Sequence, residues 1–279
     1  ARTVKCPYTG KVIPLSPNWW LQKRGEPVAV MPVFDPMAEV ARFKIVSGEG
    51  ACNGAKPDEG TVRRGNAVSP WAHNQSVNGE YIKNEAQAGR MSQQLYALVI
   101  ASSAGRSFRI PDEGDVRAVA AAEAELARKL PEWRTKGWVP DELIPEGHKT
   151  AEPRRYGMAL WSDMFAPRQI LSLCTFVEVF HEVKELIAEQ LPRERAPAVL
   201  TYLQFILSKA SNYNSRMSVW HPVRSSMANT FDRHDFSFKW THGEMDIFDV
   251  NRGLFQWGLD QVLDSYRGIA ELITPSQSS

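Results

Sequence analysis

Six acidic or imidazole side chains occur within fifteen residues near the end of the sequence. Imidazoles and carboxylates at this density could bind a divalent metal or perform general acid–base chemistry. The segment shows no regular pattern that would fix an i, i+4 pair and aim these ligands at one point, so we favour a structural role. A metal-dependent nuclease is the minor alternative. The group consists of Asp232, His234, Asp235, His242, Glu244 and Asp246.

Basic residues interleaved with amides and aromatic rings form two further groups. The first cluster surrounds Arg63-Arg64-Gly65-Asn66, and the second surrounds Asn212-Tyr213-Asn214-Ser215-Arg216. Arg and Lys attract phosphates, Asn can hydrogen-bond to adenine edges, and Tyr can stack on a displaced base. The alternatives are a solvated loop for the first cluster and a hydrogen-bond network at a helix end for the second. The predicted DNA-contacting residues are Arg63, Arg64, Lys83, Arg90, Asn214, Arg216, Arg224 and Asn229.

Several motifs of catalytic chemistry are missing from the sequence. There is no Gly-x-Ser-x-Gly element of a serine hydrolase, and His181-Glu182-Val183-Lys184-Glu185 lacks the second histidine of a zinc metalloprotease. After Val46-Ser47-Gly48-Glu49-Gly50, the third glycine, Gly54, comes one place too late for a dinucleotide loop. We expect a flexible turn there with no helix after it. The residues therefore predict no catalytic residue, no cofactor site and no metal site.

Composition and charge favour a globular chain with one basic part. Hydrophobic residues make up 43% of the 279 residues and charged residues 23%. No apolar run approaches the roughly 20 residues that span a bilayer, and the start has no signal-peptide pattern, so a cytoplasmic protein without membrane contact is expected. Residues 1–112 hold 14 Lys and Arg against 9 Asp and Glu, whereas residues 113–279 hold 19 against 23. A polyanion that meets one face fits this imbalance, as does ordinary scatter of surface charge.

The pattern of residues predicts strands first and helices later. Candidate strands lie at 19–21 and 28–30, which flank a turn at Gly25-Glu26, and at 41–46, 60–64, 94–101 and 107–110. An Ala-rich helix is expected over 116–129, ending before Pro131, and a long connector over 131–165. We divide the chain into a β-rich basic region (1–112), an Ala-rich helix with its connector (113–165) and a helical region (166–279).

Prolines and apolar spacing define the helices of the last region. One helix opens at Pro167 and stops at Pro192, and a second begins near Pro197, so the two are expected to pack as a hairpin. A short helix after Pro222 and a longer one over 254–272 are also predicted. Pro275–Ser279 is expected to be a frayed polar tail.

Short segments spread over nearly the whole chain resemble the adenine-specific DNA methylase family that contains a zinc ribbon. Their order and spacing carry the resemblance more than any single motif. The segments are Cys6-Pro7-Tyr8-Thr9-Gly10, Trp19-Trp20-Leu21, Gly60-Thr61-Val62-Arg63-Arg64-Gly65-Asn66-Ala67, Gly79-Glu80-Tyr81-Ile82-Lys83, Trp138-Val139-Pro140-Asp141-Glu142, Phe165-Ala166-Pro167-Arg168-Gln169, Tyr213-Asn214-Ser215, Trp220-His221 and Asn229-Thr230-Phe231.

The resemblance implies an α+β fold in which a β-rich N-terminal part has degenerate zinc-ribbon-like hairpins and a mainly helical part follows. Where the family has paired Cys-Pro-x-Cys-Gly knuckles, this chain keeps Cys6, has Thr9 in place of the partner, and has Ser69-Pro70-Trp71-Ala72 at the second knuckle. One cysteine cannot close a four-ligand zinc site, so no zinc is expected. Packing of Trp19, Trp20 and Trp71 is expected to hold the ribbon instead.

The resemblance also implies which parts of the enzyme are elsewhere. The family's methyl transfer uses a Gly-rich loop for S-adenosylmethionine and an Asp/Asn-Pro-Pro-Tyr motif around the flipped base, and this sequence has no Pro-Pro pair. The chain therefore resembles the inserted, DNA-facing middle region of an adenine-specific methyltransferase, such as one serving restriction or phage defence, and is expected to be inactive by itself. Expected partners are double-stranded DNA and the catalytic methyltransferase domain. The alternative is a non-catalytic protein-interaction module of a defence complex, anchored by its many Trp residues.

Overall fold

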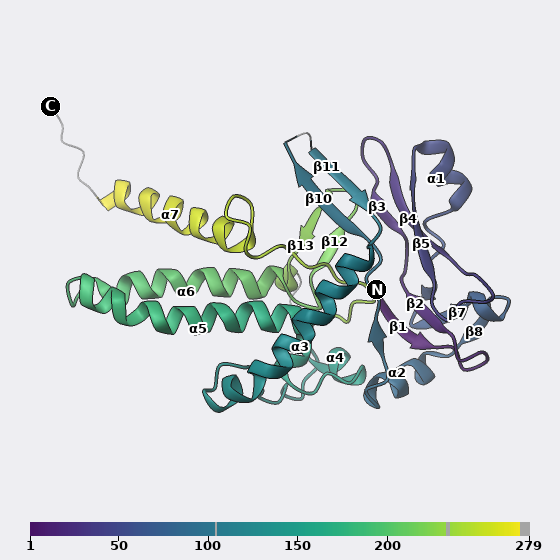
Figure 1. The fold of residues 1–279 in the computed structure, drawn as a ribbon, viewed down its shortest axis with the longest axis horizontal. Coiled ribbons are helices and arrows are strands. Elements are labelled where there is room, and N and C mark those ends of the chain that lie inside the picture. Colours follow the sequence, from purple (N-terminus) through teal and green to yellow (C-terminus); the bar gives the residue numbers. More distant parts are fainter. Residues whose placement is uncertain (104, 233–234, 274–279) are drawn as a thin grey trace.

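The structure, a computed structural model, describes residues 1–103, 105–232 and 235–273. Small antiparallel sheets make up the N-terminal part, and long helices follow (Figure 1). This arrangement confirms the α+β class and the order in which the strand-rich and helical parts were predicted. The predicted tail at 275–279 lies outside the described residues, as does His234.

Within the described residues, the strands pair in five small sheets, with the orders β2-β1-β9, β3-β4-β5, β6-β7-β8, β10-β11 and β12-β13. Gly25, with a φ of +72°, permits the turn that joins β3 and β4, as the sequence predicted. The strands are β1 (Arg2–Lys5), β2 (Val12–Leu15), β3 (Trp20–Gln22), β4 (Val28–Val33), β5 (Arg42–Ser47), β6 (Val62–Arg63), β7 (Asn66–Ser69), β8 (Gln75–Val77), β9 (Ser92–Gln93), β10 (Leu98–Ser102), β11 (Gly105–Arg109), β12 (Val219–His221) and β13 (Ser226–Ala228).

The long helices confirm most of the predictions made from proline positions. Pro167 occupies the first turn of α5, Pro192 follows its end, and α6 begins one residue before Pro197. The helices are α1 (Glu49–Ala55), α2 (Gly79–Gln87), α3 (Glu113–Thr135), α4 (Ala151–Arg155), α5 (Pro167–Gln190), α6 (Ala196–Tyr213) and α7 (Leu254–Ile273), with 3-10 turns η1 (Pro70–Ala72), η2 (Trp161–Met164) and η3 (Thr230–Asp232).

Helix α3 does not end before Pro131, so that prediction was wrong. The helix continues to Thr135 although the proline ring removes one backbone hydrogen bond. The turn beyond it is held by Trp133, which is fully buried and donates its indole N–H to Glu178 of α5 at 3.2 Å. Burial of a large aromatic side chain thus outweighs the local cost of the proline.

Two further elements differ from the predictions. The segment after Pro222 is the turn of the β12–β13 hairpin and not a short helix, and Ser225 adopts a φ of +48° within it. The 131–165 connector is partly structured, because it contains α4 and η2 and buries Ile144 and Met158. In addition, the short helix α1 follows Gly48, where no helix was expected.

The hydrophobic cores cross the predicted region boundaries. A cluster around Val4, Ile13 and Ile82 of the β-rich part is also covered by Tyr156 of the connector and Trp240 of the last region. Backbone contacts follow the same pattern, since the Arg2 N–H donates to the Trp240 carbonyl at 2.9 Å. The regions 1–112, 113–165 and 166–279 therefore share their cores.

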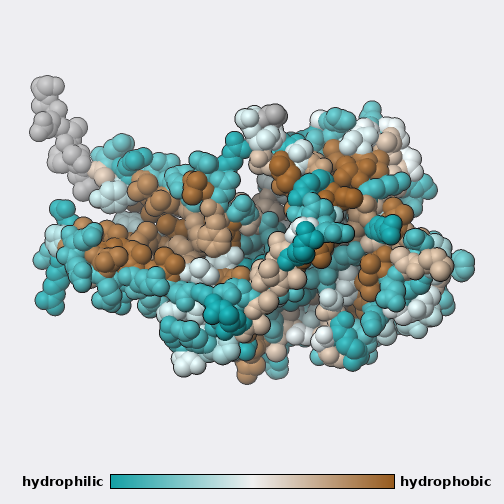
Figure 2. Space-filling model, viewed as in Figure 1, coloured by the Kyte–Doolittle hydropathy of each residue, from teal (hydrophilic) through white to brown (hydrophobic). Residues whose placement is uncertain are grey.

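The helices α5, α6 and α7 extend away from the sheets as one arm (Figure 1). α6 lies between α5 and α7, and α3 crosses the base of α5. At the base, Leu173, Ala210 and Leu254 are buried together. Toward the far end the helices are much less covered, and apolar side chains gather on that surface (Figure 2).

Candidate nucleic-acid interface

The first cluster is built on the β6–β7 turn and the helix beside it. Arg64 and Gly65 both have positive φ values, 52° and 84°, which makes a tight two-residue turn and places Arg63 opposite Asn66. The Asn66 side chain accepts a hydrogen bond from the Gly79 backbone N–H at 2.8 Å, at the start of α2. A Cβ on Gly79 would lie 2.7 Å from the Gly65 carbonyl oxygen, so glycine permits this close approach. The turn is therefore fixed against α2.

Only part of this cluster keeps an uncompensated positive charge. Arg63 and Arg64 are exposed, and their guanidinium groups have no hydrogen-bond or ion-pair partner among the described residues. Lys83 pairs with Glu80 at 2.6 Å. Arg90 forms two hydrogen bonds with Glu85, at 2.9 and 2.6 Å, and lowers the pKa of that carboxyl group. The two arginines of the turn are thus the stronger candidates for phosphate contact.

The second cluster surrounds a hollow of about 300 Å³ between the end of α6 and the β12–β13 hairpin. Three groups that the sequence singled out, Tyr213, Arg224 and Asn229, lie together in its lining. In the part of the chain that the structure describes, the lining consists of Tyr213, His221, Arg224, Ser226, Met227, Ala228 and Asn229. The structure thereby brings an aromatic ring, a guanidinium and an amide to one concave site.

Polar groups in the hollow remain open to a ligand. Arg224 is exposed, and within the described ranges neither its guanidinium nor the Asn229 amide has a partner. The Nδ1 atom of His221 accepts the Arg224 backbone N–H at 3.3 Å, which leaves the Nε2 atom for a ligand. The lining therefore offers both hydrogen-bond donors and acceptors.

Asn214 and Arg216 do not belong to this open surface, contrary to the prediction. Asn214 is 2% exposed, and its Oδ1 accepts from the Gln169 side chain and the Met245 backbone, both at 3.2 Å. Arg216 is largely enclosed, donates to the Asp163 carbonyl at 3.2 Å, and has a pKa lowered by burial. These two residues form the predicted alternative, a hydrogen-bond network at a helix end.

The β12–β13 hairpin is fixed to the β-rich part and brings in a charge that the sequence did not reveal. The Trp220 indole donates to the Leu21 carbonyl at 2.6 Å, and the Lys23 N–H donates to the Pro222 carbonyl at 2.9 Å. Exposed Arg24 follows Lys23, so it lies next to the hairpin turn that carries Arg224. No local sequence pattern connects Arg24 to the turn that carries Arg224, because the hydrogen bond between Lys23 and Pro222 joins distant parts of the chain.

The acidic and imidazole group of the last region does not converge on one point. His242 is buried, and burial lowers its pKa to about 4. Burial alone would raise the pKa of Glu244, but hydrogen bonds from His242 and Arg168 lower it to about 2. Asp246 accepts backbone N–H groups of its own turn, and Asp235 is exposed. The side chains of Asp232 and His234 lie outside the described part.

The two knuckle positions of the β-rich part meet in space. The Ser69 hydroxyl donates to the Cys6 sulfur at 3.0 Å. Burial alone would raise the pKa of the Cys6 thiol, but hydrogen bonds from Ser69, Thr9 and the Tyr8 backbone lower it. Trp71 packs between two cores and donates to the Val12 carbonyl at 2.9 Å, and Trp19 is buried under β3–β5. Trp20, in contrast, is only half-buried, and its indole binds Asp58.

Comparison with known proteins gave no matching family model, no matching curated protein and no matching solved structure. Within the described ranges, each helix is too short or too polar to span a lipid bilayer. In the same ranges, no three His, Cys, Asp or Glu side chains are grouped so as to hold a metal ion. The two clusters and their geometry are therefore the features that bear on function.

Proposed function

We propose that this chain is the DNA-facing inserted region of an S-adenosylmethionine-dependent, adenine-specific DNA methyltransferase. The observation that carries the proposal is the convergence of Tyr213, Arg224 and Asn229 on one hollow. The free arginine pair of the β6–β7 turn adds a second point of attraction for phosphates. Together these groups would hold the DNA backbone and position the target nucleotide.

The knuckle geometry supports the resemblance to the zinc-ribbon methylases. Ser69 and Thr9 both hydrogen-bond to Cys6, so three of the former ligand positions still face one another. Hydrogen bonds and the Trp71 contact would replace the metal as the link between the two hairpins. Such a substitution retains the ribbon geometry without the four soft ligands that zinc needs.

The residues of this chain do not fit S-adenosylmethionine. The strand–glycine–helix element that comes nearest to such a loop is β5–Gly48–α1, but β5 is antiparallel to β4, and α1 has only seven residues with Glu49 in its first turn. Nucleotide-type cofactor loops normally lie at the ends of parallel strands before a longer helix. Methyl transfer is therefore assigned to the catalytic domain, where the cofactor supplies the methyl group.

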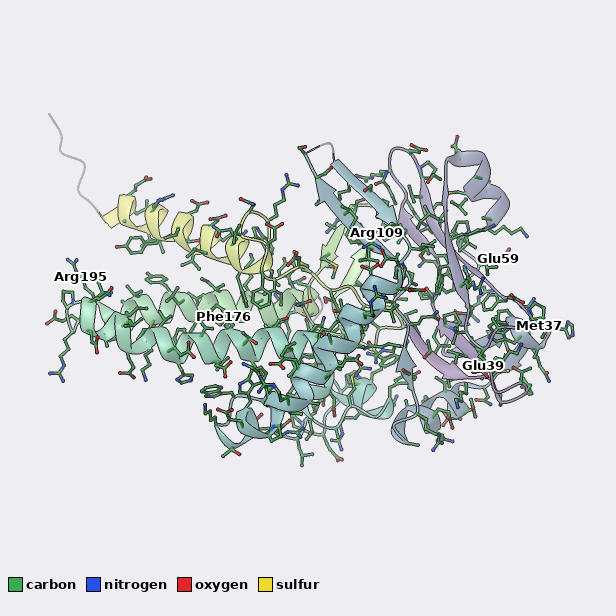
Figure 3. All side chains as sticks on the ribbon, viewed as in Figure 1. Met37, Glu39, Glu59, Arg109, Phe176 and Arg195 are labelled. Atoms are coloured by element: carbon green, nitrogen blue, oxygen red, sulfur yellow. The ribbon has the colours of Figure 1, made fainter. Side chains whose placement is uncertain are left out.

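Duplex DNA binding, measured by fluorescence anisotropy over a salt series, tests the proposal. Removing one arginine that neutralises a phosphate should reduce the log–log salt slope by about 0.9, so Arg63→Ala/Arg64→Ala should reduce it by about 1.8. Arg195→Ala, an exposed arginine at the far end of the arm (Figure 3), is the matched control and should leave the slope unchanged. Addition of S-adenosylmethionine should have no effect. No binding at low salt, or equal slopes for both variants, would refute a DNA-facing role.

The exposed apolar side chains of the arm favour a second candidate function, a protein-interaction module. Large apolar patches on a protein surface commonly mark interfaces, and Figure 2 shows such side chains along the arm. Phe205 of α6 is 53% exposed, and Ile269 and Leu272 of α7 are 51% and 88% exposed. The partner expected for this candidate is another subunit of a restriction or phage-defence complex.

Co-purification with the other subunits of such a complex tests the second candidate. Phe205→Asp/Ile269→Asp should abolish the association, because each substitution places a charge in an apolar interface. Both side chains are about half exposed, so the thermal midpoint of the chain should change little. Val68→Asp, which changes an exposed side chain of strand β7, is the control and should retain the association. Retention by the arm variant as well would exclude the arm as the interface.

A further inference from the structure

We infer that the hollow between α6 and the β12–β13 hairpin binds one unstacked adenosine nucleotide, with its phosphate on Arg224, its base on Tyr213 and its adenine edge on Asn229. This inference rests on the proposed function and assigns a ligand class to one of its two clusters. It concerns a site in the insertion, separate from the catalytic centre that performs methyl transfer.

The size and rigidity of the hollow suit a small ligand. Its volume of about 300 Å³ lies at the lower end of the range for small-molecule sites, about 300–1,000 Å³. The Tyr213 ring is held by an edge contact with Trp257, with centroids 5.0 Å apart, and by the Lys209 ammonium at 5.5 Å. The hairpin wall is tied to β3 by the Trp220 indole. The walls are therefore preformed, which lowers the entropic cost of binding.

The charge of the lining favours an anion. Within the described ranges, Arg224 is the single cation that lines the hollow, and none of the other six lining residues is a carboxylate. Its guanidinium has no acidic partner in the described part of the chain. A guanidinium presents a planar set of donors that matches a phosphate, so the phosphate of a nucleotide is the natural counter-ion.

The remaining lining groups favour a base and, at the N7 edge of the two purines, adenine over guanine. The Tyr213 ring and the apolar Met227 and Ala228 side chains provide stacking and van der Waals surface. The Asn229 amide presents a donor and an acceptor side by side, which matches the adjacent acceptor and donor of an adenine edge. Guanine presents two acceptors at the corresponding edge and leaves one amide group unpaired.

Isothermal titration calorimetry with 5′-AMP, adenosine and 5′-GMP separates the two parts of the inference. Loss of a charged hydrogen bond typically weakens binding about tenfold or more, so AMP should bind at least about tenfold more tightly than adenosine. Arg224→Ala should remove that difference. AMP should also bind more tightly than GMP, and Asn229→Ala should remove that second difference. Adenosine and AMP of equal affinity would overturn the phosphate assignment, and GMP equal to AMP would overturn the adenine assignment.

Variants of the ring and of a remote arginine make the test specific to the hollow. Tyr213→Phe keeps the stacking surface and should bind AMP within about twofold, whereas Tyr213→Leu should lose about tenfold. Arg195→Ala is the charge-matched control and should bind AMP like the wild type. An equal loss in Arg195→Ala and Arg224→Ala would mean non-specific attraction and overturn the site.

Failure of this inference differs from failure of the proposed function. Salt-dependent duplex binding that requires Arg63 and Arg64, with no AMP binding at millimolar nucleotide, would retain the DNA-facing role and reject the nucleotide site. AMP binding that requires Arg224, with no duplex binding, would retain the site and reject the DNA-facing role. A 2-aminopurine nucleotide in the duplex adds a direct readout, because its fluorescence rises when it leaves the base stack and should respond to Tyr213→Leu.

Discussion

The two predicted clusters keep fewer open members than the sequence indicated, for opposite physical reasons. At the β6–β7 turn and α2, Lys83 and Arg90 stay on the surface but are paired with Glu80 and Glu85. Around the β12–β13 hairpin, Asn214 and Arg216 are removed from the surface by burial. What remains is also different, since the turn keeps two exposed charges and the hairpin keeps a concave site.

The same residue types therefore serve distinct tasks according to their surroundings. Exposed surface ion pairs contribute little energy and can open at small cost. A buried amide whose partners are removed costs much more. Substitutions in the second cluster should separate into those that change stability and those that change binding, whereas substitutions of the paired charges in the first should change neither strongly.

Asn214→Leu should have the strongest effect on stability. The leucine has a similar size but leaves the Gln169 amide and the Met245 N–H without an acceptor, so the free energy of unfolding should fall by about 2–4 kcal/mol. Urea unfolding measures the loss. The matched control is Asn229→Leu, whose amide has no partner in the described part, and it should change stability by less than about 0.5 kcal/mol. Equal stability losses in the two variants would contradict the separation of this cluster into buried structural residues and residues that line the hollow.

Acid should destabilise the segment behind the hollow in two steps. His242 has its pKa lowered from 6.5 to about 4, so the unfolded chain gains a proton first and stability falls as the pH drops from 6.5 to 4. Glu244 has its pKa lowered from 4.5 to about 2, so its contribution is present above 4.5 and is lost between 4.5 and 2. Thermal midpoints from pH 7 to pH 3 measure both steps.

His242→Gln isolates the first of these steps. Glutamine does not titrate, so the decline between pH 6.5 and 4 should become smaller while the decline below pH 4.5 remains. If the thermal midpoint of the variant declined between pH 6.5 and 4 as much as that of the wild type, groups other than His242 would be responsible for the decline.

Removal of a surface ion pair as a unit should have the weakest effect. Glu80→Ala/Lys83→Ala leaves the net charge unchanged, so the duplex DNA affinity should change by less than about twofold. The anisotropy salt series used for Arg63→Ala/Arg64→Ala measures it under the same conditions. A tenfold loss would mean that Lys83 leaves Glu80 to contact phosphate, and the contrast between the two clusters would weaken.

The fold was predictable where local signals agree. Pro167 and Pro192 bracket a regular apolar spacing, and α5 follows it closely. The prediction was wrong at Pro131 because a local helix-breaking signal competes with the burial of Trp133, which depends on α5. It was wrong after Pro222 because the hairpin is stabilised by β3, a distant strand.

The site was predictable in its residue types and not in their surroundings. Asn214 and Asn229 each lie near aromatic and polar residues in the sequence, yet only Asn229 lines the hollow. The burial of Asn214 depends on Gln169 of α5 and on the segment that contains Met245. No local sequence pattern encodes these contacts. Arg24 was missed for the same reason.

The hydrogen bond between Trp220 and Leu21 has a consequence for the order in which the chain folds during its synthesis on the ribosome. The two residues are separated by 199 positions, so the outer edge of β3 stays uncovered until the β12–β13 hairpin has been synthesised. At about 5–20 residues per second, that delay is on the order of 10–40 s. An uncovered strand edge can pair with another chain during this time. The nascent protein should thus be most prone to aggregation, and most dependent on chaperones, until the β12–β13 hairpin emerges.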